Sequence, residues 1–154
     1  MHITELTKKS FSIIGKEGST LEGQGFIGRL WDDANGHFGE VASLAKYDDN
    51  GNLCGIFGAM SDFSRSFMPW ENGFTEGLYL AGVECRDDAT APEGWTKWTV
   101  PGYRYLVCEN EDGAFPAMLA ELEKRGLSLA GAVHDFHSPA NGNDYLYFPI
   151  EKLD

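Results

Sequence analysis

The sequence has little of what several common classes of protein need. Its three cysteines, Cys54, Cys85 and Cys108, are odd in number and far apart, and no CxxC pair occurs. This excludes a disulfide framework and a cysteine-based zinc site, so we interpret the thiols as small buried apolar groups. There is no run of about 18 apolar residues, and the N-terminal segment lacks the charged-then-apolar order of a signal peptide. We therefore expect a cytoplasmic protein without membrane contact.

Basic charge is also scarce. The chain has 12 Lys and Arg against 24 Asp and Glu, a formal net charge of −12 at pH 7. Nucleic-acid binding needs clustered Lys and Arg, but only the pairs Lys8-Lys9 and Lys124-Arg125 are adjacent. We expect no direct contact with nucleic acid. The acidic excess confers solubility and would tolerate a cationic ligand.

Familiar catalytic signatures are missing. The sequence contains no P-loop, dinucleotide-binding fingerprint, HExxH motif or nucleophile elbow. The four histidines show no metal-ligand spacing, and the DNGN segment at 49–52 lacks the remaining positions of a calcium loop. We expect neither a metal nor a cofactor.

Aromatic residues, in contrast, are abundant, with 10 Phe, 6 Tyr and 4 Trp. The stretch Leu53–Cys85 holds two strand-like apolar runs joined by a link rich in aromatics, and its GAMSDF motif (58–63) is answered by GAVHDF (131–136). Each half of the chain then reads as strand, helix, strand, strand. The predicted elements are 11–15, 25–45, 53–62 and 78–84 in the first half and 103–109, 115–125, 129–136 and 145–151 in the second.

An internal duplication explains this order. We predict one α+β domain over residues 1–154, built from two βαββ units at about 8–86 and 95–154. The two units would share an antiparallel sheet with two helices on one face and a ligand cleft between the halves. The chain would open with a strand over Ile3–Glu17, and Asn35-Gly36 would break or kink the first helix.

The repeated motif suggests candidate residues for chemistry. Strand alternation puts His134 and Phe136 on one face and Asp135 on the other, and Phe63 matches Phe136 in the first copy. If the first of these faces lines the cleft, His134 is a titratable group beside aromatic rings. The alternative is a half-buried strand histidine bonded to a neighbour. For Asp62 and Asp135 we expect hydrogen bonds to loop amides at the strand ends.

The aromatic excess is open to two interpretations. Most aromatic side chains of a small domain belong to its core, but buried Tyr and Trp also need partners for their O–H and N–H groups. Several are therefore expected at the edge of a cavity, as an aromatic cage for a flat or cationic molecule. Glu84, on the strand 78–85, could face such a ligand or activate water, although a solvated surface role is the simpler alternative.

Several segments resemble one known family in order and spacing. They are YLAGVE at Tyr79–Glu84, a Trp/Thr strand ending in VPGYRYLV at Val100–Val107, the helix after it, and the closing strand YLYFPIEKL. Together they look like the GyrI-like, or effector-binding, domains. The resemblance covers nearly the whole chain and implies paired βαββ repeats around a cleft for aromatic or cationic small molecules. It also implies a gyrase or a transcription regulator of the AraC or MerR type as a partner.

A stand-alone subfamily of these domains, similar to this sequence, opens the cyclopropane ring of DNA-alkylating natural products. That resemblance implies an aromatic sandwich from Trp70, Tyr79, Phe136 and Tyr147, with Glu84 or His134 as the base. The full candidate sets are catalytic Glu84, His134 and Tyr79, and ligand-binding Trp31, Phe63, Trp70, Tyr79, Phe136, Tyr145 and Tyr147. In many relatives a glutamate on the last strand meets the cation, whereas Tyr145 occupies that place here. Binding without turnover, or an interaction with gyrase, stays open as an alternative.

Overall fold

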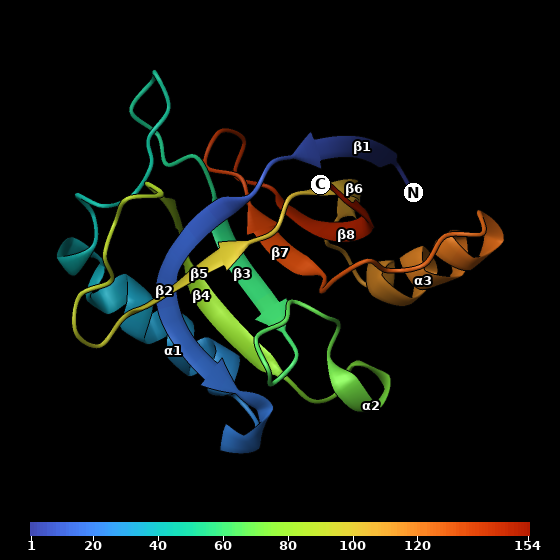
Figure 1. The fold of residues 1–154 in the computed structure, drawn as a ribbon, viewed down its shortest axis with the longest axis horizontal. Coiled ribbons are helices and arrows are strands. Elements are labelled where there is room, and N and C mark those ends of the chain that lie inside the picture. Colours follow the sequence, from blue (N-terminus) through green and yellow to red (C-terminus); the bar gives the residue numbers. More distant parts are fainter.

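The computed structural model describes residues 1–154 as one eight-stranded antiparallel sheet with helices packed against it (Figure 1). The α+β class with an antiparallel sheet is therefore confirmed. The strands are β1 (Ile3–Lys8), β2 (Phe11–Ser19), β3 (Ile56–Ser61), β4 (Leu78–Cys85), β5 (Thr96–Val100), β6 (Tyr103–Glu109), β7 (His134–His137) and β8 (Asp144–Lys152). The α-helices are α1 (Phe26–Gly36), the short α2 (Glu71–Phe74) and α3 (Ala114–Lys124), and single 3₁₀ turns lie at Thr20–Glu22 and Phe38–Glu40.

The strands run across the sheet in the order β1-β6-β8-β7-β3-β4-β2-β5. The sequence of elements β2-α1-β3-β4 is followed later by β6-α3-β7-β8, as the repeated pattern predicts. The repeated motif contributes β3 and the start of β7, and these two strands pair with each other at the middle of the sheet. The two halves therefore meet along β3 and β7.

The opening strand was predicted wrongly as one continuous element. It is divided at Lys9-Ser10 into β1, which pairs with β6, and β2, which pairs with β4 and β5 at the other side of the sheet. The side chains differ accordingly, because β1 is mostly exposed whereas Phe11 to Gly15 at the start of β2 are buried. A polar edge strand and an apolar inner strand follow each other without a turn signal, so the local pattern hides the break.

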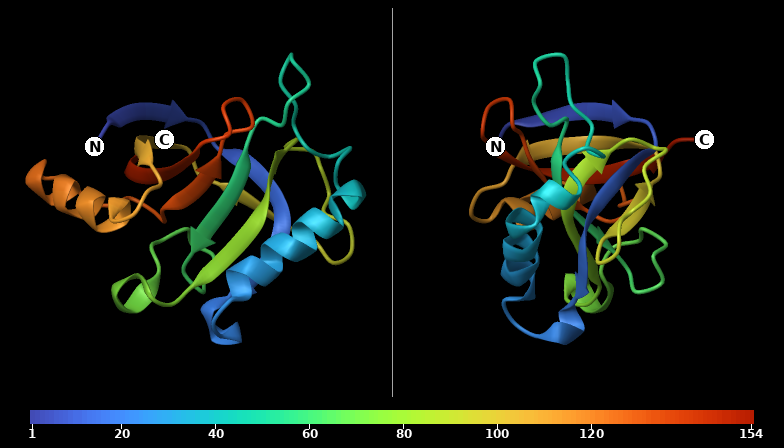
Figure 2. Two further views of the ribbon diagram at one scale, coloured as in Figure 1. Left: turned by 180° about the vertical axis from the view of Figure 1, so that it is seen from behind. Right: turned by 90° about the vertical axis from the view of Figure 1, so that its left-hand side faces the viewer.

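Both long helices lie on the same face of the sheet. The register pairs Tyr79 with Met60, Gly58 with Asp135, and Asp135 with Leu146, and directly opposed residues point to the same side. Tyr79 packs under α1 and Leu146 under α3. Figure 2 shows α1 along the β2–β4 side and α3 along the β6–β8 side, with β3 and β7 between them.

The first helix is shorter than its apolar spacing predicts. It ends at Gly36, where Asn35-Gly36 was expected to break or kink it, and a 3₁₀ turn at Phe38–Glu40 continues the chain. The second long helix agrees with the prediction to within one residue at each end. Gly126 follows it with φ +70°, the left-handed conformation that commonly ends a helix.

The opposite face of the sheet carries the largest core cluster. Its buried members come from both halves and are Phe11, Ile13, Phe57, Ala59, Leu78, Leu80, Trp98, Val100, Tyr103, Tyr105, Val107 and Tyr147. Phe63 and Phe67, in the loop after β3, pack against this cluster. Much of the aromatic content of the chain is therefore ordinary core. No helix has the length and apolar character needed to cross a membrane.

Candidate functional site

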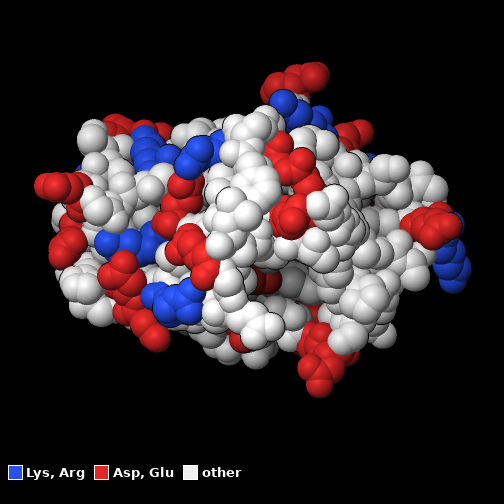
Figure 3. Space-filling view, turned by 90° about the horizontal axis from the view of Figure 1, so that it is seen from below, with Lys and Arg blue, Asp and Glu red and all other residues white.

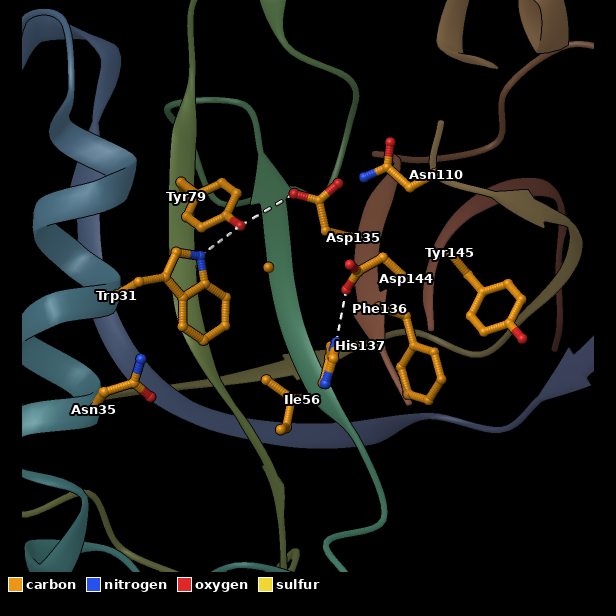
Figure 4. Close-up of a pocket in the computed structure, with 11 residues that line it drawn as sticks. Trp31, Asn35, Ile56, Tyr79, Asn110, Asp135, Phe136, His137, Asp144 and Tyr145 are labelled. Carbon is orange, nitrogen blue, oxygen red and sulfur yellow. Dashed lines mark hydrogen bonds and ion pairs between the residues drawn. The ribbon is translucent and has the colours of Figure 1, made fainter. Parts of the chain in front are cut away.

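A cleft of about 440 Å³ opens on the helix-bearing face, between α1 and the β7–β8 side of the sheet (Figure 4). Residues from both halves of the chain line it: Trp31, Asn35, Ile56, Gly58, Tyr79, Asn110, Asp135, Phe136, His137, Asp144 and Tyr145. The cleft thus lies where β3 meets β7. This is the general position that two converging halves predict.

A chain of hydrogen bonds crosses the cleft. The indole Nε1 of Trp31 donates to the hydroxyl of Tyr79 at 3.1 Å, and that hydroxyl donates to Oδ2 of Asp135 at 3.1 Å. The three residues come from α1, β4 and β7, and Figure 4 shows their side chains converging. Gly58 lies between Tyr79 and Asp135, and a Cβ at this position would overlap the Tyr79 hydroxyl. The missing side chain is what allows the contact.

Asp135 is the most perturbed carboxylate of the cleft. Burial raises the pKa of Asp135 to about 6, because the charged form loses hydration. The hydrogen bond from Tyr79 acts against this and lowers the pKa, while the negative charge of Asp144 raises it. At neutral pH Asp135 therefore carries a negative charge in a poorly solvated place, and a cation would relieve this cost.

Tyr79 is buried and serves as a donor. Burial, together with the neighbouring Asp135 charge, raises the pKa of the Tyr79 phenol well above its ordinary value. The phenol thus stays protonated at physiological pH. A neutral phenol can accept from Trp31 and donate to Asp135 at the same time, so it connects the two walls of the cleft.

A second carboxylate, that of Asp144, lies at the mouth of the cleft. Oδ1 of Asp144 lies 2.7 Å from Nδ1 of His137, and both side chains are partly exposed at the mouth. Asn35 and Asn110 are the other polar lining residues, and the lining includes neither Lys nor Arg. Figure 3 shows acidic atoms inside a hollow of the lower face, between uncharged walls. The lining therefore holds two carboxylates and no Lys or Arg, and its one histidine contacts Asp144 and not Asp135.

Four of the predicted ligand-binding residues line this cleft: Trp31, Tyr79, Phe136 and Tyr145. Trp31 and Tyr79 point into it, whereas the rings of Phe136 and Tyr145 point away from the Trp31–Tyr79–Asp135 group (Figure 4). Both rings pack against the core on the helix-free face. They form the rim of the cleft and do not form its floor.

The other predicted residues lie elsewhere. Phe63 and Tyr147 pack on the helix-free face, and Trp70 lies farther along the helix side, where its Nε1 donates to the carbonyl of Leu78 at 2.9 Å. Glu84 is buried on the helix-free face and accepts a hydrogen bond from Lys8 at 2.9 Å, with Lys46 at 3.6 Å. Its carboxylate is neutralised by these two lysines.

His134 also points away from the cleft, between the rings of Phe57 and Tyr105. Burial lowers the pKa of His134 to about 4, so the imidazole is neutral at physiological pH. Its Nδ1 lies 3.4 Å from the amide nitrogen of Met60, and its Nε2 has no partner in the protein. The structure therefore agrees with the alternative of a buried strand histidine.

The structure brings Asp135 into the site, although sequence reasoning assigned it to loop bonding. Asp62 does bond its loop, accepting from the amide of Ser66 at 2.9 Å, but Asp135 bonds Tyr79 instead. The signal was present in the alternation, which put Asp135 and His134 on opposite faces. Alternation alone did not determine which of these two faces carries the cleft. No group of three or more His, Cys, Asp or Glu side chains is placed to hold a metal ion.

Comparison with solved structures finds the same fold in several other proteins. SAV2435, solved with bound tetraphenylphosphonium, superposes with a TM-score of 0.62 at 15% identity, covering 98% of this chain and 94% of that one. A putative bacterial transcription regulation protein from Staphylococcus aureus MU50 superposes with a TM-score of 0.57 at 15% identity, covering 98% of this chain and 99% of that one. The C-terminal domain of EcmrR superposes with a TM-score of 0.59 at 11% identity, covering 99% of this chain and 98% of that one. At these identities the comparison shows a shared fold, and the sequence matches no protein-family model and no curated protein.

Proposed function

We propose that this protein binds a small aromatic or lipophilic cation in the cleft between α1 and β7, with Asp135 as the counter-charge. The observation that carries the proposal is the Asp135 carboxylate, held on the floor of an aromatic-walled cleft that has no Lys or Arg. Asp144 adds a second negative charge at the mouth. Trp31 presents an indole beside the carboxylate, and aromatic faces attract cations.

Three further features support this function. The chain resembles the GyrI-like domains over most of its length, and its fold is shared with SAV2435, which was solved with a lipophilic cation. The replacement of the expected glutamate by Tyr145 does not leave the cleft without acid, because Asp135 and Asp144 supply the charge from neighbouring strands. A binding role also needs no catalytic base.

Hydrolysis of a cyclopropane ring would require different residues from those that the resemblance implies. Glu84 and His134 are on the far side of the sheet, so neither can activate water in this cleft. Asp135 and Tyr79 would have to serve as base and acid. Catalysis would appear as a water-added product whose amount exceeds that of the protein, and product that stops at one equivalent or below would exclude turnover. A gyrase or regulator partner is a separate hypothesis, for which a pull-down is the direct test.

The test of binding uses two molecules of nearly the same shape and opposite charge. Calorimetric titration should show binding of tetraphenylphosphonium and no binding of tetraphenylborate. Asp135→Asn should weaken phosphonium binding at least about tenfold, since a charge-assisted contact of more than ~1.4 kcal/mol is lost. Asp88→Asn removes the same charge from an exposed site outside the cleft and should have no effect. Equal affinity of the two ions, or of the two variants, would contradict the proposal.

A further inference from the structure

An apolar hollow of about 240 Å³ lies under the C-terminal part of α1, on the same face of the sheet as the cleft. We call it the α1 hollow. Its walls are mostly aliphatic or aromatic and include Ile14, Ala34, Phe38, Leu53, Ile56 and Val83. No lining residue carries a charge, and the indole N–H groups of Trp31 and Trp95 are already bonded to other residues. The exposed Asn35 is the only other polar side chain of the lining.

The α1 hollow adjoins the cleft, and three residues line both: Trp31, Asn35 and Ile56. Trp31 and Asn35 are four residues apart on α1, so their side chains share one face of the helix. Ile56 lies on β3, on the side of the sheet that faces the helices. The two hollows therefore share a wall from α1 and a floor from the sheet.

The strand register shows that this floor is continuous. A row of directly paired residues crosses β2, β4, β3 and β7 as Ile14, Val83, Ile56 and His137. Paired residues point to the same side of a sheet, and neighbouring strands are about 4.8 Å apart. The first three members of the row line the α1 hollow, and the last two line the cleft. Ile56 is only half-buried, so the floor is open to solvent where the two hollows meet.

The hydrogen bonds of the cleft lie beside this junction. Trp31 directs its Nε1 to the Tyr79 hydroxyl, and Figure 4 shows Asn35 and Ile56 on the other side of the indole from Tyr79. The bond between Tyr79 and Asp135 crosses the sheet at Gly58, which is two residues, or about 7 Å, from Ile56 along β3. A path over Ile56 therefore does not have to displace the Tyr79 hydroxyl.

The α1 hollow differs from the cleft in chemistry. The cleft offers the carboxylates of Asp135 and Asp144, whereas the hollow offers apolar and aromatic surface. An apolar cavity of about 150 Å³ can hold a molecule of benzene. The α1 hollow is therefore large enough for one aromatic ring or a short alkyl chain. A ligand whose charge met Asp135 would place such a group over Ile56 without burying a second charge.

We propose that the α1 hollow binds the uncharged arm of a cationic ligand whose head lies in the cleft against Trp31 and Asp135. The arm passes over Ile56, between β3 and the face of α1 that carries Trp31 and Asn35. This inference rests on the proposed function, because it extends the same site. It names the ligand class as a flat cation with one apolar substituent, whose length determines the affinity.

The test is a series of N-alkylpyridinium ions from methyl to octyl, titrated against the full chain by calorimetry. All members have the same head, so differences between them measure the arm. The dissociation constant should fall by up to about fourfold for each methylene that enters the α1 hollow, and should level off once the hollow is filled. The quantity compared between variants is the ratio of the dissociation constants of the methyl and hexyl ions.

Two variants change the α1 hollow in opposite ways. Ala34→Met fills it from α1 with a flexible side chain and should bring the ratio close to one, because the arm has no place left. Leu53→Ala removes part of one wall and should lower the ratio about threefold or more. Neither residue lines the cleft. If Ala34→Met does not fold, Leu53→Ala decides.

Leu44→Ala is the matched control. It makes the same substitution as Leu53→Ala at a half-buried position that packs against the core cluster of Ala34 but does not line the α1 hollow. It should retain the ratio of the parent. A parent ratio near one, a parent-like ratio in either folded hollow variant, or an equal loss in Leu44→Ala would overturn the inference and leave the proposed function standing. If no pyridinium ion binds, the inference falls, and tetraphenylphosphonium decides separately whether the proposed function stands.

Discussion

The hydroxyl of Tyr79 donates to Oδ2 of Asp135 at 3.1 Å, across the junction between the two halves of the chain. Tyr79 lies on β4 and Asp135 on β7, with Gly58 of β3 between them. This bond occupies one oxygen of the carboxylate and leaves Oδ1 without a partner in the protein. A ligand in the cleft would meet a carboxylate that is held in place, only partly hydrated and still able to accept.

Cation binding should depend on pH through Asp135. Because the pKa of Asp135 is raised to about 6, the carboxyl group is largely protonated at pH 5 and ionised at pH 7.5. A cation favours the ionised form, so its affinity should rise from pH 5 to pH 7 and then level off, with a change approaching tenfold per unit below pH 6. Titration calorimetry with tetraphenylphosphonium across this range measures the effect.

The control for this prediction is Asp135→Asn, which has no ionisable group at that position. Its weaker binding should be nearly flat over the same pH range. A wild-type profile that is equally flat, or one that falls as the pH rises, would contradict the role of Asp135.

Asp135 should lower the stability of the unliganded protein at neutral pH. The pKa is about 3.8 in the unfolded chain and about 6 when folded, so the folded state holds the proton more tightly. The free energy of unfolding therefore falls as pH rises through the window from about 4 to about 6. Asp135→Asn keeps an acceptor for Tyr79 and should add about 1–3 kcal/mol at pH 8, but little at pH 4.

Thermal unfolding at the two pH values checks this, with an expected rise of about 2–4 °C per kcal/mol at pH 8. Asp88→Asn should change neither melting temperature by a comparable amount. If Asp135→Asn destabilised the protein at pH 8, the Asp135 charge would already be compensated without a ligand. That result would contradict the argument that the carboxylate needs a bound cation.

His134 should act on stability in the opposite direction. Its pKa is about 6.5 in the unfolded chain and about 4 when folded, so the unfolded state binds the proton more readily. Stability should therefore fall by about 3 kcal/mol as pH drops through the window from 6.5 to 4. His134→Phe, among the rings of Phe57 and Tyr105, should lose this part of the acid sensitivity.

Urea unfolding at pH 7 and pH 4.5 gives the two free energies needed for His134. The exposed His2, replaced by Phe, is the control and should retain the acid sensitivity of the parent. The same loss of stability in His134→Phe and in the parent would show that other groups cause it.

Gly58→Ala should disrupt the site directly. The added Cβ would overlap the hydroxyl of Tyr79, a buried side chain that has little room to move. We expect a loss of about 1–3 kcal/mol in the free energy of unfolding, together with weaker cation binding, since Tyr79 can no longer hold Asp135. Gly28→Ala is a suitable control. Position 28 is inside α1 with nothing near its Cβ, so alanine should stabilise the helix by about 0.5–1 kcal/mol.

Much of the fold could be predicted because its signals are local. Alternation identified most strands, the apolar stripe from Phe115 to Leu122 identified α3, and Asn35-Gly36 marked the end of α1. The division of the first strand was missed because nothing in Lys9-Ser10 distinguishes a bend from a continuing strand. What separates β1 from β2 is their choice of partners, β6 for one and β4 for the other.

The candidate site was predicted only in part. Trp31 and Tyr79 were identified because aromatic residues suggested a cage, and both lie in the cleft. Alternation also separated His134 from Asp135 correctly, but it could not say which of the two faces is covered by helices. That depends on how α1 and α3 pack, and α1 belongs to the other half of the chain from β7.

The sequence by itself determined the class of fold, the order of its elements and the acidic, aromatic character of the chain, because periodicity and composition are properties of neighbouring residues. Only the tertiary structure decided that Asp135, and not His134 or Glu84, lies in the cleft. The pairing of Gly58 with Asp135 joins positions that are 77 residues apart in the sequence. It also places a residue without a side chain under the Tyr79 hydroxyl, which leaves room for the hydrogen bond to Asp135. Such a register arises from long-range packing, so no local pattern encodes it.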